Sequence, residues 1–390
     1  MEVRKLTQQE KFDARLIAAL AFHQRMEDPE KERRESEADP AEDWGAFDQD
    51  GRLMAHMIHH RFQFRLDGQW IPAGGIGAVS TLPEYRNRGA VRAIFRELLM
   101  QAHREGQVLS ALYPFCHAFY RKFGYETVRL GDRYSFSPSV LCEYRFAGKA
   151  VQWKTGDPVS GYTALYERFA SRYNLAIRRD DKRMLEDHMK GEWSRDRRFS
   201  YMLLEEDQPA AFLTFQDIRH DPAAILSVQD YAWDGRKGFL ALLGFLARFS
   251  ADYGSIEISL PTSLELASVI HAPDAYGIQQ TGMQSYMVRA VHAEKLLGIL
   301  ERPDDCAFTV QVSDPMIPDN NGCWTVRKDS VLRTEAQPDL SVSVQAFGQL
   351  AAGAVSLSEA MLREDVQVHG NEEMLKRVFV RKPILIADHY

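Results

Sequence analysis

The segment from residue 79 to residue 92 constrains the fold of this chain more than any other part of its 390 residues. It reads V-S-T-L-P-E-Y-R-N-R-G-A-V-R, so an apolar, strand-like run ends at Pro83. A short polar loop with Arg86, Arg88 and Gly89 then opens directly into a stretch whose apolar residues recur at helical spacing up to about residue 105. A strand followed at once by such a loop and a helix predicts a mixed α/β domain.

The loop ahead of this helix is a candidate anion site. The first backbone N–H groups of a helix have no partner within the helix, and they lie at the positive end of its dipole. Gly89 would let a phosphate approach the backbone closely, and Arg86 and Arg88 add positive charge. The segment therefore predicts a pyrophosphate site. The alternative that these residues leave open is a capped helix with two surface arginines.

The run Gly75-Ile76-Gly77 invites comparison with the glycine-rich motif of dinucleotide-binding proteins. That motif stands between a strand and a helix. Here the glycines lead into the strand that ends at Pro83, so the required context is missing. We expect no dinucleotide site at this position.

His56, His59 and His60 form a pattern that is typical of metal ligands. On a strand, however, His56 and His60 would face one side of the sheet and His59 the other. No acidic residue stands at a matching spacing. We therefore expect no bound metal.

The loop and the strand before it carry a family resemblance. V-x-T-x-P-x-x-R-x-R-G resembles the coenzyme A motif of the GNAT superfamily of N-acetyltransferases, in which Arg or Gln is followed by Gly three residues later and by Gly or Ala five residues later. Arg86 and Gly89 match, whereas Val91 departs from the last position. The run R-x-R-G, followed by two apolar residues and an arginine, is similar to one branch of the superfamily, the Eis-like (enhanced intracellular survival) acetyltransferases.

The resemblance implies acetyl-CoA as the co-substrate. In this superfamily the strand before the loop pairs with the pantetheine arm like an additional strand, and the loop holds the pyrophosphate. A strand break near Thr81 and Leu82 is expected to free a backbone N–H that polarises the thioester carbonyl. The cofactor-binding residues implied here are Val79, Ser80, Thr81, Arg86, Asn87, Arg88, Gly89, Ala90 and Val91.

A second motif, F-Y-R-K-F-G-Y, covers residues 119–125. Phe119 and Phe123 lie four residues apart on a predicted short helix and are expected to pack inward, which turns Tyr120 away from them. The residues alone allow a half-buried packing tyrosine. The motif resembles the Eis-like Y-x-x-F-G-Y, whose first tyrosine is the general acid, so the resemblance implies that Tyr120 protonates the leaving sulfur. Tyr125 and Tyr113 are expected to be packing residues.

The C-terminal run P-I-L-I-A-D-H-Y is unusually apolar for a chain end, so we expect it to be tied down inside the protein. In the Eis-like family the terminal carboxylate enters the active site as the base, and that group would be the carboxylate of Tyr390. Because a terminal carboxylate has a pKa of about 3.5, we expect it to orient the amine or to act through a water. A purely structural chain end remains the alternative.

The order of predicted elements divides the chain into three segments. Residues 1–145 are predicted to form a mixed α/β domain. Residues 146–290 repeat its order of elements (strand, turn, strand, strand, helix, strand), which predicts an internal duplication. The second segment has no R-x-x-G loop before its helix, so we expect no cofactor there. Residues 291–390 differ, and F-T-V-Q-V-S-D-P, N-G-C-W and the run from Asp339 to Gly353 resemble the sterol carrier protein fold.

Composition narrows the setting. No apolar run approaches the roughly 20 residues that cross a bilayer, and the polar N-terminus is unlike a secretory signal. The four cysteines form no C-x-x-C pair, so a reduced, cytoplasmic location is expected. A net charge of −7 argues against a nucleic-acid partner.

The residues and the resemblance together predict an N-acetyltransferase that uses acetyl-CoA and acts on primary amines of small cationic substrates. The resemblance implies aminoglycoside or polyamine acceptors and a homo-hexamer. A lipid-binding or regulatory protein with relic acetyltransferase domains is the alternative, motivated by the sterol carrier resemblance. The intact loop at Arg86 and Gly89, together with Tyr120, favours the enzyme.

Overall fold

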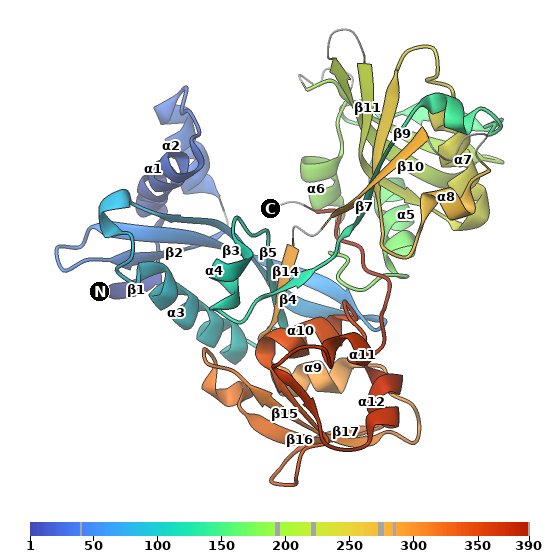
Figure 1. Cartoon of the computed structure of the whole chain (residues 1–390). Helices are drawn as coiled ribbons and strands as arrows, with labels where there is room; N and C mark the ends of the chain where they lie inside the picture. Colours follow the sequence, from blue (N-terminus) through green and yellow to red (C-terminus); the bar gives the residue numbers. More distant parts are fainter. Residues whose placement is uncertain (40, 192–195, 220–223, 272–276, 284–285, 389–390) are drawn as a thin grey trace. The chain divides into compact units, whose positions relative to one another are not determined.

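The computed structural model describes residues 1–39, 41–191, 196–219, 224–271, 277–283 and 286–388 (Figure 1). The chain forms two compact units. The first contains Met1–Val128 and Ser285–Lys382, and the second contains Arg129–Gln284 and Pro383–Asp388. Three sheets with their helices make up the molecule, which confirms the predicted mixed α/β class.

The N-terminal part of the first unit is built on a seven-stranded sheet of order β1-β2-β3-β4-β5-β14-β6. All neighbouring strands are antiparallel except β4 and β5, which are parallel. The strands are β1 (Glu2–Lys5), β2 (Glu42–Phe47), β3 (Leu53–Leu66), β4 (Gln69–Thr81), β5 (Leu109–Leu112), β6 (Glu126–Val128) and β14 (Tyr286–Ala290).

Two longer helices pack on this sheet through their apolar faces. Helix α3 (Ala90–Arg104) places Ile94, Phe95, Leu98 and Leu99 in the core at helical spacing, as its sequence predicts. Helix α1 (Lys11–Phe22) packs on β3 and β4, and the charged α2 (Pro29–Ala38) is mostly exposed beside it. Helix α4 (His117–Arg121) follows β5. In the described part of the chain, no helix is long and apolar enough to cross a membrane.

The second unit repeats the same sheet topology. Its seven strands have the order β13-β7-β12-β11-β10-β9-β8, and its only parallel pair is β11 with β12. The predicted duplication is thus confirmed at the level of topology. The strands are β7 (Gly131–Phe136), β8 (Lys149–Gln152), β9 (Arg198–Glu205), β10 (Gln208–Arg219), β11 (Ala224–Trp233), β12 (Ser255–Leu260) and β13 (Ile278–Met283); the helices are α5 (Ser160–Ala170), α6 (Asp181–Arg183), α7 (Gly235–Ala247) and α8 (Leu266–Val269).

The two seven-stranded sheets exchange one strand each. The sixth strand of the first sheet is β14, which follows β13 of the second sheet in sequence. The corresponding strand of the second sheet is β7, which follows β6 of the first. The predicted segment limits at residues 145 and 290 therefore differ from the division that the sheets make, because residues 131–136 and 286–290 each pair in the other sheet.

The C-terminal part of the first unit is a five-stranded sheet of order β17-β16-β15-β18-β19 with its own helices. Alternating burial along β15 shows that one face of the sheet is packed and the other is exposed. The elements are β15 (Ala307–Ser313), β16 (Gly322–Arg327), β17 (Ser330–Thr334), β18 (Leu340–Ser343), β19 (Val366–Val368), α9 (Ala293–Ile299), α10 (Val344–Ala352), α11 (Leu357–Ala360) and α12 (Glu372–Val378).

A fully buried ion pair joins the two parts of the first unit. Arg289 in β14 donates from Nη2 to both oxygens of Asp314, at 2.9 and 2.6 Å, and from Nη1 to the carbonyl of Phe123 at 2.6 Å. Gly124 adopts φ +86°, and a Cβ there would lie 1.7 Å from Arg289 Nη1, so only glycine fits. Arg289 therefore fixes the turn that ends the α4 region.

Replacing Arg289 by Met should destabilise the protein by about 3–5 kcal/mol, because Asp314 would be left as a buried charge without its partner. Urea unfolding followed by fluorescence measures this loss. Arg377→Met is the matched control, since Arg377 pairs with Asp305 at the surface and its removal should cost less than about 1 kcal/mol. Equal midpoints for the two variants would contradict the structural role of the buried pair.

Candidate functional site

Strand β4 has an open edge at its C-terminal end. It pairs with β5 only over Ala73–Ile76, so residues 77–81 extend past the end of β5. On the β3 side, Ala78 and Val79 both lie opposite Met57 in a β-bulge, and Ala78 adopts φ +50°. Ligands of α/β sheets bind at the carboxyl ends of parallel strands, and this edge has the same position.

The backbone of Thr81 faces this open edge. The N–H of Leu82 donates to the carbonyl of Met54 on β3 at 3.0 Å, so of the two residues at the expected strand break Leu82 is not the free donor. Because successive N–H groups of a strand point to opposite sides, the N–H of Thr81 points away from β3. Thr81 is thus the group of this pair that can meet a ligand.

The loop between β4 and α3 presents its backbone to solvent. Arg86, Asn87, Arg88 and Gly89 are all exposed, and Asn87 and Gly89 adopt φ +62° and +81°. Among the described side chains none caps the N-terminus of α3, and the first turn carries no acidic residue. A Cβ built on Gly89 would meet no atom within 4 Å. The loop therefore offers free N–H groups and open space, as an anion site requires.

Tyr85 braces this loop. Its hydroxyl donates to Asp48 at 2.6 Å, and the guanidinium of Arg88 lies 5.4 Å from the centroid of its ring. The guanidinium of Arg92, one turn into α3, lies 5.7 Å from the ring of Phe123. The positive charges of the loop are thus held near the start of α3, and the turn after α4 packs against the same helix.

Tyr120 is buried, and its ring contacts that of Phe119 rather than turning away from it as expected. Only 3% of it is exposed, and its ring packs edge-on against Phe95 of α3, Phe115 and Phe119. Helix α4 is five residues long, and the rings of Phe115 before it and Tyr125 after it also lie beside the tyrosine. Burial raises the pKa of Tyr120 well above its ordinary value, which keeps the hydroxyl protonated at neutral pH.

These elements converge at one end of the sheet. Helix α3 starts from the loop after β4, and α4 follows β5, so both lie beyond the carboxyl ends of the parallel pair. Phe95 joins them, with its ring centroid 6.2 Å from Tyr120 and 4.3 Å from Phe123. The open edge of β4, the loop and Tyr120 thus form one candidate site within the first unit.

A buried polar group that the sequence did not reveal lies beside the β4 bulge. His56 Nε2 is 2.6 Å from Asp43 Oδ1, and Lys11 Nζ is 3.3 Å from Asp43 Oδ2. Ser80 pairs directly with His56 across β3 and β4. Within the described residues, His56 Nδ1 and Ser80 Oγ are buried without a hydrogen-bond partner. Asp43 and His56 stand on neighbouring strands, so no local sequence motif marks them.

His56 and His59 of β3 form hydrogen bonds with other side chains. His59 Nε2 lies 3.1 Å from Gln107 Oε1, and His56 is bound to Asp43. In the part of the chain that the structure describes, no group of three His, Cys, Asp or Glu residues is arranged to hold a metal ion.

A hollow of about 330 Å³ lies on the α1 side of the bulge. Its charged lining includes Glu32, Arg25 and Arg15, of which Arg15 is paired with Asp39 at 2.5 Å. Phe22, Met26 and Ala78 add apolar surface. The hollow reaches β4 at Ala78, the residue of the bulge with positive φ.

The second unit has no equivalent loop. Only Asp234 separates the end of β11 from the start of α7. A Cβ on Gly238 would lie 2.1 Å from the carbonyl of Ala210, so the first turn of α7 packs tightly on β10. The sequence also has no R-x-x-G motif before this helix.

The C-terminal run is anchored in the second unit as far as Asp388. Asn174 donates to the carbonyl of Pro383 at 2.8 Å and accepts from the N–H of Leu385 at 3.1 Å. Ile384, Leu385 and Asp388 are buried. The expectation that this run is tied down is confirmed up to residue 388, and Tyr390 lies outside the described residues.

Two family models match the chain. Residues 2–128 match an acetyltransferase (GNAT) domain, and residues 290–386 match a sterol carrier protein domain. A comparison with curated protein sequences found no match.

Solved structures share the fold over the whole chain. A probable N-acyltransferase from Enterococcus faecalis has a TM-score of 0.83 at 20% identity and covers 98% of both chains. Eis1 from Mycobacterium abscessus has a TM-score of 0.82 at 19% identity, with 100% of both chains covered. A GCN5-related N-acetyltransferase from Anabaena variabilis has a TM-score of 0.84 at 17% identity, also with full coverage. The three-sheet architecture is therefore Eis-like.

The buried histidine makes a prediction about acid stability. Burial lowers the pKa of His56, and protonation of Nδ1 would place an N–H where it has no acceptor. Below the ordinary pKa of about 6.5 the unfolded chain takes up this proton and the folded chain does not, so stability should fall by about 1.4 kcal/mol per pH unit. His56→Gln removes the titration, so wild type should lose more stability than this variant between pH 7.5 and 5.5.

Unfolding free energies from urea titrations at several pH values measure this difference. The exposed His369→Gln is the control and should follow the wild-type pH dependence. Parallel curves for wild type and His56→Gln would show that His56 does not titrate differently in the folded state.

Proposed function

We propose that this chain, a GNAT acetyltransferase with a C-terminal sterol carrier protein domain, transfers an acetyl group from acetyl-CoA to a primary amine of a small cationic molecule. The observation that carries the proposal is the uncapped, open loop at Arg86–Gly89 beside the free edge of β4. A GNAT domain implies an acyl-CoA co-substrate. The open space at Gly89 and the free N–H groups fit its pyrophosphate.

In this proposal the co-substrate is bound by two kinds of backbone contact. The N–H groups from Asn87 to Val91 and the guanidinium groups of Arg86 and Arg88 hold the pyrophosphate. The pantetheine arm pairs with the open edge of β4 at Val79–Thr81 as an added strand. The end of β5 at Leu112 supports this, because it leaves that edge of β4 without a neighbouring strand.

The chemistry is direct transfer. A neutral amine attacks the thioester carbonyl carbon, the C–N bond forms and the C–S bond breaks. The N–H of Thr81 polarises the carbonyl oxygen, and Tyr120 gives its proton to the leaving sulfur. Burial raises the pKa of Tyr120, but the same apolar surroundings also raise the basicity of a thiolate formed beside it, so the proton transfer stays feasible.

The terminal carboxylate of Tyr390 is the proposed partner of the acceptor amine. A carboxylate of ordinary pKa is a weak base toward an ammonium ion. In the proposal it therefore attracts and orients the cation, or takes the proton through a water molecule. The residues before it are anchored in the second unit up to Asp388.

Aminoglycosides and polyamines are the proposed acceptors, on the resemblance to the Eis-like family. Thiol release from acetyl-CoA, measured with kanamycin-like aminoglycosides, polyamines and simple arylalkylamines, tests the proposal. Turnover with the cationic acceptors supports it, and the absence of thiol release with every amine would refute it.

A lipid carrier is the second candidate function, favoured by the sterol carrier protein match over residues 290–386. Calorimetry separates the two functions. Binding of acetyl-CoA to the protein supports the enzyme, whereas lipid binding without acetyl-CoA binding supports the carrier. A homo-hexamer, a cytoplasmic location and the lack of a nucleic-acid partner remain proposals, and sedimentation analysis tests the first of them.

Replacing Tyr120 by Phe should lower kcat by about 100- to 10,000-fold, because a general acid contributes a factor of that size. Acetyl-CoA binding measured by calorimetry should stay unchanged. A loss smaller than about tenfold would contradict the acid role.

Tyr125→Phe is the matched control for this variant. Tyr125 is fully buried nearby, and its hydroxyl shares a 2.7 Å hydrogen bond with Ser110. Its loss should cost about 1 kcal/mol of stability and leave kcat within a few-fold of wild type. A drop in kcat equal to that of Tyr120→Phe would show that aromatic packing, not proton donation, sets the rate.

Adding two residues after Tyr390 should lower kcat by about tenfold or more, because displacing a positioned group by about 1 Å can cost a factor of 100. Acetyl-CoA binding should not change. The same two residues added before Met1 are the control. An unaffected rate in the C-terminal variant would rule out a catalytic role for the carboxylate.

A further inference from the structure

The buried pair of His56 and Ser80 beside the β4 bulge is polar but not satisfied by its surroundings. Ser80 lies directly opposite His56 in the pairing of β4 with β3, so the two side chains are neighbours on one face of the sheet. His56 is fully buried, and Ser80 is 3% exposed. Among the described residues, His56 Nδ1 and Ser80 Oγ have no hydrogen-bond partner. Proteins rarely leave buried polar atoms unpaired, because each one costs stability, so this pair calls for a functional explanation.

The second copy of the fold carries a polar pair at the corresponding place. Strands β4 and β11 correspond, because each pairs antiparallel with the preceding strand and parallel with the following one. Each contains a bulge, and the pairs just beyond it are His56 with Ser80 in β4 and Thr214 with Asp230 in β11. Thr214 is satisfied, since its hydroxyl lies 2.7 Å from that of Ser200.

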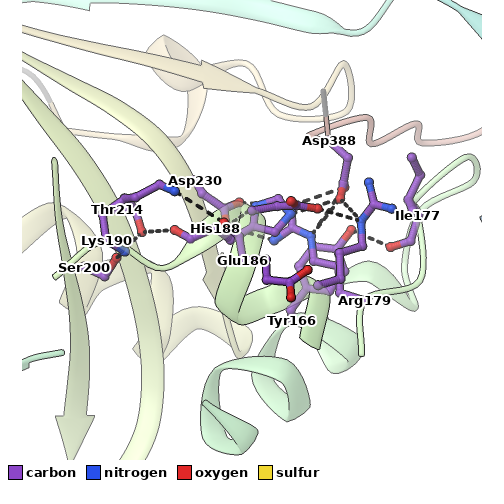
Figure 2. Close-up of polar contacts among 12 residues, drawn as sticks. Tyr166, Ile177, Arg179, Glu186, His188, Lys190, Ser200, Thr214, Asp230 and Asp388 are labelled. Atoms are coloured by element: carbon purple, nitrogen blue, oxygen red, sulfur yellow. Dashed lines mark hydrogen bonds and ion pairs between the residues drawn. The ribbon is translucent and has the colours of Figure 1, made fainter. Parts of the chain in front are cut away.

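Asp230 is satisfied as well (Figure 2). It accepts from Arg179 Nη1 at 2.8 Å and from Nη2 at 3.2 Å, and His188 Nδ1 lies 3.2 Å from its carboxylate. Arg179 and His188 also bind Asp388 within the same unit. The bulge itself therefore does not require unpaired polar atoms, and those of the first copy are a property of that copy.

The hydrogen bond to Asp43 decides which nitrogen of His56 can accept a proton. A carboxylate only accepts, so His56 Nε2, 2.6 Å from Asp43 Oδ1, carries the ring proton and Nδ1 carries the lone pair. Lys11 Nζ lies 3.3 Å from Asp43 Oδ2, and Arg15 is the other cation near the ring. Burial lowers the pKa of His56, Asp43 raises it, and Arg15 and Lys11 lower it again, so overall it lies below its usual range. The ring is therefore neutral at pH 7, with Nδ1 as its proton acceptor.

His56 lies on the opposite face of the sheet from Tyr120. Side chains alternate between the two faces along a strand, and Met57, which follows His56, belongs to the core cluster that contains Tyr120. His56 therefore points to the other face, where helix α1 supplies Lys11 to Asp43. The amine nitrogen and the sulfur are different substituents of the reacting carbon, so a base and an acid on different faces can reach one each.

Ser80 connects this base with the edge of β4 where the thioester is proposed to lie. Four covalent bonds separate Ser80 Oγ from the backbone nitrogen of Thr81, so the two atoms lie at most about 5 Å apart. The N–H of Thr81 is the proposed donor to the thioester carbonyl. On the same face as His56, the hollow of about 330 Å³ beside α1 reaches β4 at Ala78, two residues before Ser80. Ser80 thus links the proposed transfer site to His56.

We propose that Ser80 and His56 form a proton relay that takes the proton of the attacking amine. As the C–N bond forms, the proton moves from the amine nitrogen to Ser80 Oγ, directly or through one water molecule, and Ser80 passes its own proton to His56 Nδ1. Asp43 stabilises the resulting imidazolium, as the third member of a Ser-His-Asp triad does. The C–S bond breaks as Tyr120 protonates the sulfur.

The protons balance over one turnover. His56 releases the proton of the amine to solvent, and Tyr120 regains one from solvent, so no further reactant is needed. The inference deepens the proposed acetyl transfer and rests on it. Ser80, His56, Asp43 and Tyr120 all belong to the first unit.

The pH profile of kcat/KM tests the relay in the full-length protein. The acceptor is the most active amine of the panel used for thiol release, and kcat/KM is expressed per neutral amine so that its own ionisation drops out. For wild type we expect a plateau near pH 8 and, below the pKa of His56, a fall of about tenfold per pH unit. His56→Gln should lower the plateau by about 100-fold or more and remove the fall between pH 8 and 5. The KM for acetyl-CoA should stay within about twofold.

Ser80→Ala interrupts the relay and keeps the pair of His56 with Asp43. It removes a buried hydroxyl that has no partner among the described residues, so the Tm should equal or exceed that of wild type. We expect kcat to fall about tenfold or more. A protein that becomes slower without becoming less stable is not explained by a structural role of this serine.

His59→Gln is the matched control for His56→Gln. His59 lies on the same strand, is almost fully buried and bonds to Gln107 at 3.1 Å. This variant should keep kcat within a few-fold of wild type and should keep the fall of kcat/KM at low pH. Circular dichroism and thermal unfolding establish that each variant is folded at every pH compared.

The outcomes separate the relay from the proposed function. A fall at low pH that persists in His56→Gln, or a wild-type profile without one between pH 8 and 5, would overturn the relay. A wild-type kcat in Ser80→Ala would overturn it too. In each of these cases wild type still transfers acetyl groups, so the proposed function stands. The absence of thiol release by wild type with every amine would refute the function and the relay together.

Discussion

The buried pair between Arg289 and Asp314 is the interaction on which the first unit depends. It lies where strand β14, the turn after α4 and the sterol carrier protein domain meet. Because one guanidinium binds both the carboxylate and the carbonyl of Phe123, the position of Tyr120 is linked to a residue of the C-terminal domain. The domain that matches the sterol carrier protein model is therefore part of the framework that holds Tyr120.

The two copies of the duplicated fold differ in the connection before the helix and in the polar groups beside the bulge. In the first copy a long loop separates β4 from α3, and its backbone is open to an anion. In the second copy the strand runs almost directly into α7, and Gly238 packs against β10. The bulge is present in both. Among the described residues, the polar groups beside it are buried without a hydrogen-bond partner in the first copy, whereas in the second copy Arg179 and His188 bind Asp230. The copy with the short connection before its helix is thus also the copy with a buried ion cluster.

Much of this could be predicted from the sequence, because the signals are local. The strand, loop and helix around Arg86 and Gly89 are predicted by consecutive residues. The order of strands and helices in the two copies is predicted in the same way. Tyr120 was found by its motif, but its direction was not, since a five-residue helix is too short for face periodicity to decide burial. The pairs His56 with Asp43 and Arg179 with Asp388 join residues far apart in sequence, and no spacing rule connects them.

The exchange of β7 and β14 has a consequence for how the protein is made. During synthesis the first sheet lacks its sixth strand, β14, until residues 286–290 have left the ribosome. Until then the edges of β5 and β6 that pair with β14 are exposed. All strands of the second sheet precede β14 in the chain, so the second sheet can be completed first. A gene fragment that ends after β6 would encode the loop at Arg86–Gly89 without strand β14 in its sheet, and the domains of this chain cannot be separated by simple truncation.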